Sequence, residues 1–521
     1  MPLTARRVLI AVLFAILVSW AWFPLFQGGF RGDELRTLSE ARDGSRSLFE
    51  VHGTDGHPLA AFALRAVSSA ADVGSSTSAW PLRLEAALLV LLAAWMIGRF
   101  ARRVLAPWCG GELARAAGWA ASLVFALHPL SVASVASLSS HGDLLALPLG
   151  AACGWAYLRG RQEQHLPSLA AALVFAVLAG LSSDLALGLC GWLAGVEFSS
   201  ARRHRKLHTR LRSAATTLAV AAACVGVDTL ARSVAFGHFS PPRAFAEFAL
   251  PDSGAGCAAA FATACERIGL LFVPINAHVV GAWGFTLAGF VALAGLQPIL
   301  IAARSAPRLW GWMLLAWLIA LGFAELCAPA ASVTPYDMRA AGTLTSAVVV
   351  ASVGLAVSIT AMSGLRRVVL PLVIGLAYAA LSHGNALAYR AAERELALLA
   401  PSIAAEHNAP NVLVVDAPDL VYGVTACRGA ATWLASRDVF VRDISTAALC
   451  ALAREDEFDA LRAAGLVLIR RANAASEQWS STRLSQPRPS SGARSASREG
   501  LLKDLDVEPA TTRALLVRAA A

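Results

Sequence analysis

Two histidines and an aspartate stand in a short polar break between two apolar segments of the chain. His128 precedes a proline, His141 and Asp143 flank a glycine, and apolar sequence resumes directly afterwards. Ionisable side chains are costly at membrane depth, so they usually face a cavity or a partner there. Residues 128–145 therefore predict a functional hairpin at a membrane face. The alternative is structural, because proline ends a helix and polar side chains cap its neighbours.

A pair of carboxylates, Asp33-Glu34, follows the first apolar segment. At the outer face of a membrane, a sugar carried on a lipid phosphate would be presented to such a pair. In sugar transfer without a covalent intermediate, the acceptor hydroxyl must lose its proton, and an aspartate can be the base. The departing lipid phosphate then needs an arginine, a histidine or a metal ion. The alternative is a pair of solvated loop acids balanced by Arg31 and Arg36, which charge pattern alone favours.

A third polar elbow, Ser182-Ser183-Asp184, separates two further apolar segments. Taken alone, this elbow is more typical of a structural turn. Together, the three elbows fall on the same predicted face of the membrane, which favours a shared site.

The composition places the chain in a membrane. Of its 521 residues, 57% are hydrophobic and only 15% are charged, and the mean hydropathy is +0.58, which excludes an ordinary soluble protein. The net charge of +9 does not indicate nucleic acid, because the arginines cluster at the ends of apolar segments. This distribution is the positive-inside pattern of membrane proteins.

Eleven segments approach the length of about 20 apolar residues that a membrane-spanning helix needs. With a cytoplasmic N-terminus, the arginine clusters fall on the cytoplasmic side of a bacterial inner membrane. The long loop 27–82 and the tail from residue 388 then lie outside, in the periplasm. Residues 256–276 are interpreted as a re-entrant or interfacial helix, since a further span there would reverse everything that follows. The expected spans are 8–26, 83–100, 114–134, 143–158, 167–182, 185–199, 214–234, 284–303, 309–327, 341–362 and 368–386.

The tail differs from the rest in composition. Asn411–Asp416, Asp438–Val441 and Gly465–Ile469 are strand candidates between alanine-rich helical stretches. They predict a small α/β domain within residues 388–521. The segment 475–498 is rich in Ser, Arg and Pro and is expected to be disordered. The fold class is therefore an α-helical polytopic membrane domain over residues 1–387, followed by this small soluble domain.

No cofactor is indicated by the sequence. The nine cysteines show neither CxxC nor Cys/His spacing, so no metal site is predicted from them, although a divalent metal ion remains open as a partner of the phosphate.

These features together resemble the GT-C superfamily of polytopic glycosyltransferases. The likeness is greatest to protein O-mannosyltransferase-like proteins and to the membrane half of the tetratricopeptide-containing O-mannosyltransferases. It covers residues 1–385 in order, topology and spacing, and its most specific part is the His-Pro to Asp-Leu-Leu stretch. The matching positions are Asp33-Glu34, His57-Pro58-Leu59, His128 to Leu145, Ser182-Ser183-Asp184, 270–274 and Tyr336 to Arg339.

The resemblance implies an inverting enzyme that takes a sugar from a polyprenyl-phosphate donor and passes it to an acceptor on the external face. Membrane lipids and an acceptor of unknown class are its expected partners, and nucleic acid is not. Asp33 would be the general base, with Glu34 beside it. The substrate site would be formed by His57, His128, His141, Asp143 and Asp184, and Arg339 or Arg243 would face the phosphate.

The chain departs from the family pattern at cationic positions. The family's arginine before the aspartate is His141 or Gly142 here, and its Arg-Pro-Leu arginine is His57. Its Ser-Lys-Glu elbow has lost the lysine. Arg65, Arg243, Arg267 and Arg339 are candidates to replace the missing charge. The alternatives are a GT-C-like scaffold without activity, and a transporter or other lipid-handling membrane protein.

Overall fold

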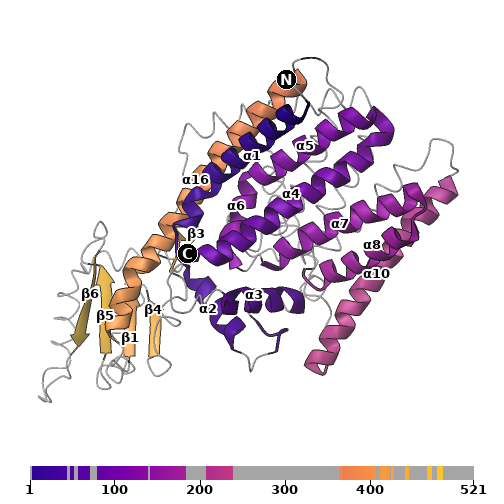
Figure 1. The fold of residues 1–521 in the computed structure, drawn as a ribbon. Coiled ribbons are helices and arrows are strands. Elements are labelled where there is room, and N and C mark those ends of the chain that lie inside the picture. The colour runs from indigo at the N-terminus through magenta and orange to yellow at the C-terminus, as the bar shows by residue number, and fades with distance from the viewer. Residues whose placement is uncertain are drawn as a thin grey trace, which may run out of the picture. The chain divides into compact units, whose positions relative to one another are not determined.

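The computed structural model divides into two compact units, which are described separately. The first comprises Met1–Gly28 with Glu40–Arg390, and the second comprises Gly29–Ser39 with Ala391–Ala521 (Figure 1). Within them the structure describes residues 3–43, 47–51, 57–70, 79–138, 141–183, 207–238, 364, 366–406, 411–418, 420–421, 424–427, 440–444, 466–471 and 478–484.

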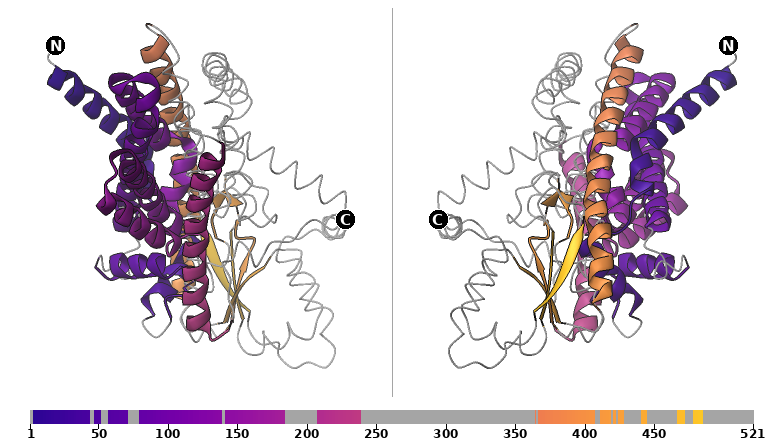
Figure 2. Two further views of the ribbon diagram at one scale, coloured as in Figure 1. Left: turned by 90° about the vertical axis from the view of Figure 1, so that its right-hand side faces the viewer. Right: turned by 90° about the vertical axis from the view of Figure 1, so that its left-hand side faces the viewer.

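The first unit is helical. Helix α4 packs against both α5 and α7, α7 packs against α8, and α8 packs against α10 (Figures 1 and 2). A short α6 follows α5 after a sharp bend. The helices are α1 (Leu3–Phe26), α3 (Pro58–Ala70), α4 (Trp80–Cys109), α5 (Gly111–Leu127), α6 (Pro129–Ala136), α7 (His141–Glu163), α8 (Leu166–Gly180), α10 (Leu207–Phe236) and the first part of α16 (Arg366–Ala405).

Within the described residues, two helices are long and apolar enough to cross a membrane, Trp80–Pro107 and Pro371–Ala405. A third is obtained if Gly111–Leu127 and Pro129–Ala136, bent by 56°, form one broken span. Helices also overlap the segments expected at 8–26, 143–158, 167–182 and 214–234. The expected segments 185–199, 256–276, 284–303, 309–327 and 341–362 lie outside the described residues, so the total of eleven spans stays a prediction.

Helices α4 and α5 approach each other at two glycines. A Cβ atom on Gly98 would collide with Ser122 Oγ, and one on Gly118 would lie 2.5 Å from the carbonyl oxygen of Gly98. The Ser122 hydroxyl donates a hydrogen bond of 2.7 Å to the carbonyl oxygen of Ala94. Small residues let two membrane helices come this close, and polar side chains then bond across them.

The second unit contains most of α2 (Gly32–Arg42), up to Ser39, together with the end of α16 and a small sheet. Its four-stranded sheet has the order β4-β1-β5-β6, in which β1 is parallel to β4 and β5, and β6 is antiparallel to β5. The strand interpretations near 411, 440 and 466 are therefore confirmed. The strands are β1 (Asn411–Val415), β2 (Leu420–Val421), β3 (Val424–Thr425), β4 (Phe440–Ile444), β5 (Leu466–Arg471) and β6 (Trp479–Leu484) (Figure 1).

One expectation for the tail is wrong. Residues 479–484 fall in the segment 475–498 that was expected to be disordered, yet they form β6. The backbone of this strand pairs with β5 from Leu466 opposite Leu484 to Arg471 opposite Trp479, and Trp479 is buried. Backbone pairing with a buried partner strand outweighs a polar composition, since it satisfies the N–H and C=O groups of both strands.

We expect Gly118→Ala to lower the stability of the first unit by about 1–3 kcal/mol, because the added methyl group meets the backbone of α4. Gly226→Ala in α10 is the matched control. No atom lies within 4 Å of its added Cβ, so it should be neutral or stabilising by up to about 1 kcal/mol. Thermal unfolding of both variants in detergent measures the difference. A rise in Tm for Gly118→Ala equal to that of the control would contradict the close approach.

Candidate functional site

His128 lies at the bend between α5 and α6 and acts as the N-cap of α6. Its Nδ1 atom accepts a hydrogen bond of 3.3 Å from the backbone N–H of Leu130. Its ring packs edge-on against Tyr378 of α16, with the ring centroids 4.9 Å apart. Pro129 occupies the first helical position, where no intrahelical donor is needed. His128 thus caps α6, as the structural alternative predicted, and its assignment to the substrate site stays a prediction.

Two further side chains of α16 hold the same bend. Ser382 Oγ donates a hydrogen bond of 2.8 Å to the carbonyl oxygen of Leu127, and Asn385 Nδ2 donates one of 3.4 Å to that of Pro129. Both side chains are buried. A broken helix leaves carbonyl groups without intrahelical partners, and these bonds satisfy them.

The structure brings together two of the polar elbows. Ser183 Oγ donates a hydrogen bond of 2.5 Å to Asp143 Oδ1. Gly142 is so close to the backbone of Ser182 that a Cβ atom there would collide with its carbonyl oxygen. The start of α3 joins the same place, because the backbone N–H of Leu59 donates to the carbonyl oxygen of Leu181 at 3.2 Å. Asp184 lies outside the described residues.

His141 faces a carboxylate of α4. Its Nε2 atom lies 3.4 Å from Glu85 Oε1, and the His141 side chain is buried while that of Glu85 is partly buried. His141 Nε2 and Glu85 Oε2 have no hydrogen-bond partner among the described residues. Buried polar atoms in native proteins are nearly always bonded, so such atoms point to a water molecule, an ion or a ligand.

His57 contacts a buried ion pair of α10. Arg232 Nη2 lies 3.1 Å from His57 Nε2 and 3.2 Å from Nδ1, while Arg232 Nε donates to Asp228 Oδ2 at 2.9 Å. All three side chains are at most 4% exposed. Arg232 therefore places a cation beside His57.

The arginines that the sequence analysis proposed as replacements for the missing positive charge lie elsewhere. Arg65 donates to the backbone carbonyl oxygens of Ala41 at 2.8 Å and Asp43 at 3.2 Å, and so fixes the chain after α2. Arg243, Arg267 and Arg339 lie outside the described residues.

Arg83, Glu85, Asp228 and Arg232 were missed by the sequence analysis. Arg83 is fully buried and donates to the carbonyl oxygen of Val135 at the end of α6, at 3.2 Å. Asp228 and Arg232 are opposite charges four residues apart inside an apolar segment, which on a helix places them on one face. Charges inside an apolar span are a signal of a site, and this spacing could have revealed the pair.

Glu34 has a structural role within the second unit. Its carboxylate accepts hydrogen bonds from the backbone N–H of Arg31 at 3.1 Å and from the Arg31 guanidinium at 2.9 Å. This arrangement, three residues into α2, satisfies a donor at the helix start as a capping box does. Glu34 pairs with Arg31 as the alternative interpretation expected, but its side chain is buried on α2 and is not a solvated loop acid. Asp33 lies one residue earlier, in the first turn of α2.

The described residues contain no group of three His, Cys, Asp or Glu side chains arranged to hold a metal ion. The cluster of polar side chains on α4, α7 and α10, with those directly before α3 and shortly after α8, includes more carboxylates than guanidinium groups. Such a set accepts hydrogen bonds from hydroxyl groups. The residues of this cluster are His57, Arg83, Glu85, His141, Asp143, Ser183, Asp228 and Arg232.

Comparison with known proteins identifies the fold. No family model matches the chain, and no curated protein matches it in sequence. Two crystal structures of ArnT from Cupriavidus metallidurans, one in the apo state and one bound to undecaprenyl phosphate, match it with a TM-score of 0.52 and 15% identity. They cover 94% and 93% of this chain and 100% of the ArnT chain. The chain is thus a helical membrane protein with an ArnT-like fold and a small C-terminal sheet.

Proposed function

We propose that this chain is a membrane glycosyltransferase of the GT-C type. It takes a sugar from a polyprenyl-phosphate donor and passes it to an acceptor on the external face of a bacterial inner membrane. The ArnT-like fold supports this proposal, because one of the matching ArnT structures holds undecaprenyl phosphate. The order of motifs from Asp33 to Asp184 supports it independently.

The observation that carries the proposal is the buried pair of His141 and Glu85. Each presents a polar atom without a partner among the described residues, at the start of α7 and near the start of α4. A sugar offers many hydroxyl groups, and each can donate to a carboxylate or imidazole acceptor. Asp143, held by Ser183, adds a further acceptor beside His141. We assign these residues to recognition of the donor sugar.

The reaction follows from inversion at the anomeric carbon. The acceptor oxygen forms a bond to this carbon while the bond from the carbon to the phosphate oxygen breaks. The hydroxyl proton passes to Asp33, and the lipid phosphate leaves with the electron pair of the broken bond. Arg243 and Arg339 are assigned to the departing phosphate, since guanidinium groups bind phosphate oxygens through paired hydrogen bonds. Neither a metal ion nor a cofactor is assigned.

The finer assignments follow from the sequence motifs. A mannose-type sugar and a protein acceptor correspond to the O-mannosyltransferase-like pattern. His128 is assigned as a positioning residue at the bend between α5 and α6. The tail beyond residue 388 is assigned to binding the acceptor in the periplasm.

We expect Asp33→Asn to lower sugar transfer by about 10²–10⁴-fold, because it removes the general base. Glu34→Gln is the matched neighbouring variant. It weakens the contact with Arg31, so it should lower stability more than turnover. Transfer from a polyprenyl-phosphate donor by the purified full chain, with thermal unfolding measured in parallel, separates the two effects.

Equal transfer by wild type and Asp33→Asn would exclude the base assignment. Transfer by neither protein, with lipid donor present and the fold intact, would favour a scaffold or transporter.

We expect Arg232→Met to destabilise the chain by about 3–5 kcal/mol, because Asp228 is left buried without its cation. The double variant Asp228→Leu/Arg232→Met removes both charges and should regain most of this stability. If Arg232 serves the site beside His57, the double variant still loses at least tenfold in transfer. Thermal unfolding and turnover of the three proteins measure both effects. If the folded double variant transfers sugar as fast as wild type, Asp228 and Arg232 have only a packing role.

A further inference from the structure

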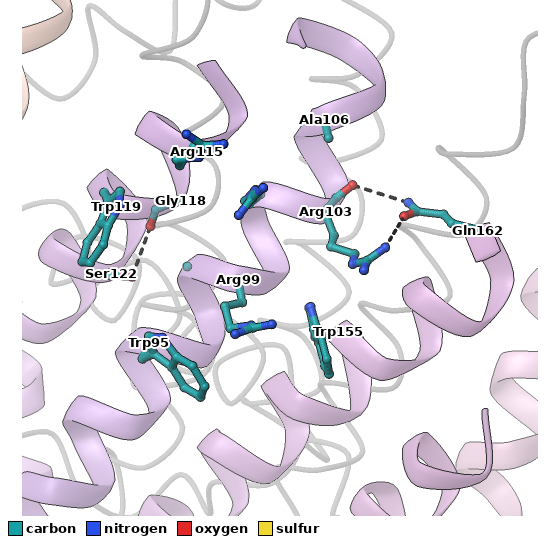
Figure 3. A pocket seen from close by; sticks show the side chains of 12 residues that line it. Trp95, Arg99, Arg103, Ala106, Arg115, Gly118, Trp119, Ser122, Trp155 and Gln162 are labelled. Atoms are coloured by element: carbon teal, nitrogen blue, oxygen red, sulfur yellow. Dashed lines mark hydrogen bonds between the residues drawn. The ribbon is translucent and has the colours of Figure 1, made fainter. Parts of the chain in front are cut away.

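A basic pocket lies between α4, α5 and α7, far along α4 from Glu85. Arg102 follows Glu85 by 17 residues, which on a helix is about 25 Å and close to the thickness of a membrane core. The pocket has a volume of about 570 Å³ (Figure 3). Its lining contains guanidinium groups and indole rings but no carboxylate. The charged and aromatic lining residues are Arg99, Arg102, Arg103, Arg115, Trp95, Trp119 and Trp155.

The arginines of this pocket are held in different ways. Arg99 lies between two indole rings, 4.9 Å from the centroid of Trp95 and 4.7 Å from that of Trp155 (Figure 3). Stacking on aromatic faces fixes a guanidinium group without neutralising its charge. Arg102 and Arg115 have no carboxylate partner among the described residues.

Among the described residues, the carboxylate of Glu163 stands beside the pocket. Arg103 donates to it at 2.8 Å and Arg159 at 3.0 Å. The hydrogen bond from Arg103 and, to a smaller extent, that from Arg159 hold the pKa of Glu163 below its ordinary value. Glu163 is therefore ionised at neutral pH and offsets one of the two charges that contact it. The charges of Arg99, Arg102 and Arg115 are left for an anion.

The surface of α4 leading to the pocket is apolar. Leu84, Leu88 and Leu92 are each more than 40% exposed, and Trp95 is 50% exposed. Their spacing of three to four residues continues to Arg99 and Arg102, so all of them lie on one face of the helix. An acyl chain lying along these leucines would end at the guanidinium groups. A soluble anion gains nothing from this apolar surface, so the surface favours a lipid as the ligand.

We propose that this pocket binds the phosphate headgroup of an anionic phospholipid. The lipid would come from the leaflet at this end of α4, which the positive-inside rule predicts to be cytoplasmic. Basic pockets between membrane helices on that side hold anionic headgroups, and arginine binds phosphate oxygens in pairs. The site is separate from the cluster around His141 and does not depend on the proposed sugar transfer.

The test measures binding of phosphatidylglycerol to the full chain by native mass spectrometry from detergent. Phosphatidylcholine with the same acyl chains, and inorganic phosphate, are the comparison probes. Arg102→Gln should weaken binding of phosphatidylglycerol about fivefold, as expected for one arginine at a membrane surface. Arg161→Gln is the charge-matched control, because Arg161 is exposed in the last turn of α7 and does not line the pocket. It should change binding less than twofold.

Three results would overturn the proposal. Equal losses in the two variants would mean that the arginines attract anionic lipid only through their overall charge. Equal binding of phosphatidylcholine would mean that the headgroup charge is not recognised. Displacement of the lipid by millimolar inorganic phosphate would indicate a site for a soluble anion. Because Arg102 is exposed, thermal unfolding of Arg102→Gln should match wild type, which separates binding from folding.

Discussion

Backbone polar groups that are buried among apolar helices must find partners inside the protein, since lipid offers none. This constraint is most acute where α5 ends and α6 begins, at a bend of 56°. Ser131 Oγ donates to the carbonyl oxygen of Phe125 at 2.8 Å, and Ser382 donates to that of Leu127. Residues more than 250 positions apart in the chain are thereby joined. The Ser382 hydroxyl and the Asn385 amide of α16 thus help to satisfy the carbonyl groups of this bend.

The same constraint separates the ionisable residues into two kinds. Asp228 and Arg232 neutralise each other within one turn of α10, so their burial needs little from the rest of the chain. Arg83 reaches the open carbonyl end of α6. The other kind is the pair of His141 and Glu85, which face each other from α7 and α4 with Nε2 of the histidine 3.4 Å from Oε1 of the glutamate. This pair is assigned to the proposed sugar site because its remaining polar atoms could bond a ligand.

Much of the local structure could be predicted from the sequence, because apolar length and polar breaks are local signals. Three of the four sheet strands were found for the same reason. Strand β6 was not, since its residues are polar and their order comes from pairing with β5. For His128, the residue type favours a substrate contact and the following proline favours a helix cap, and the structure shows the cap. Arg232 was missed because no periodicity relates it to His57, which lies 175 residues earlier.

The distribution of charge along α4 predicts that its two ends lie on opposite sides of the membrane. Arg99, Arg102 and Arg103 stand near its C-terminal end, where the positive-inside rule predicts the cytoplasm. Glu85 near the N-terminal end then falls on the external side, where the sequence places the polar elbows. The pairing of Asp143 with Ser183 shows that two of these elbows do meet. Because α5 and α7 pack against α4, the orientation predicted for α4 applies to these helices as well. The sequence of α4 thus predicts on which side of the membrane Glu85 and the residues beside it lie.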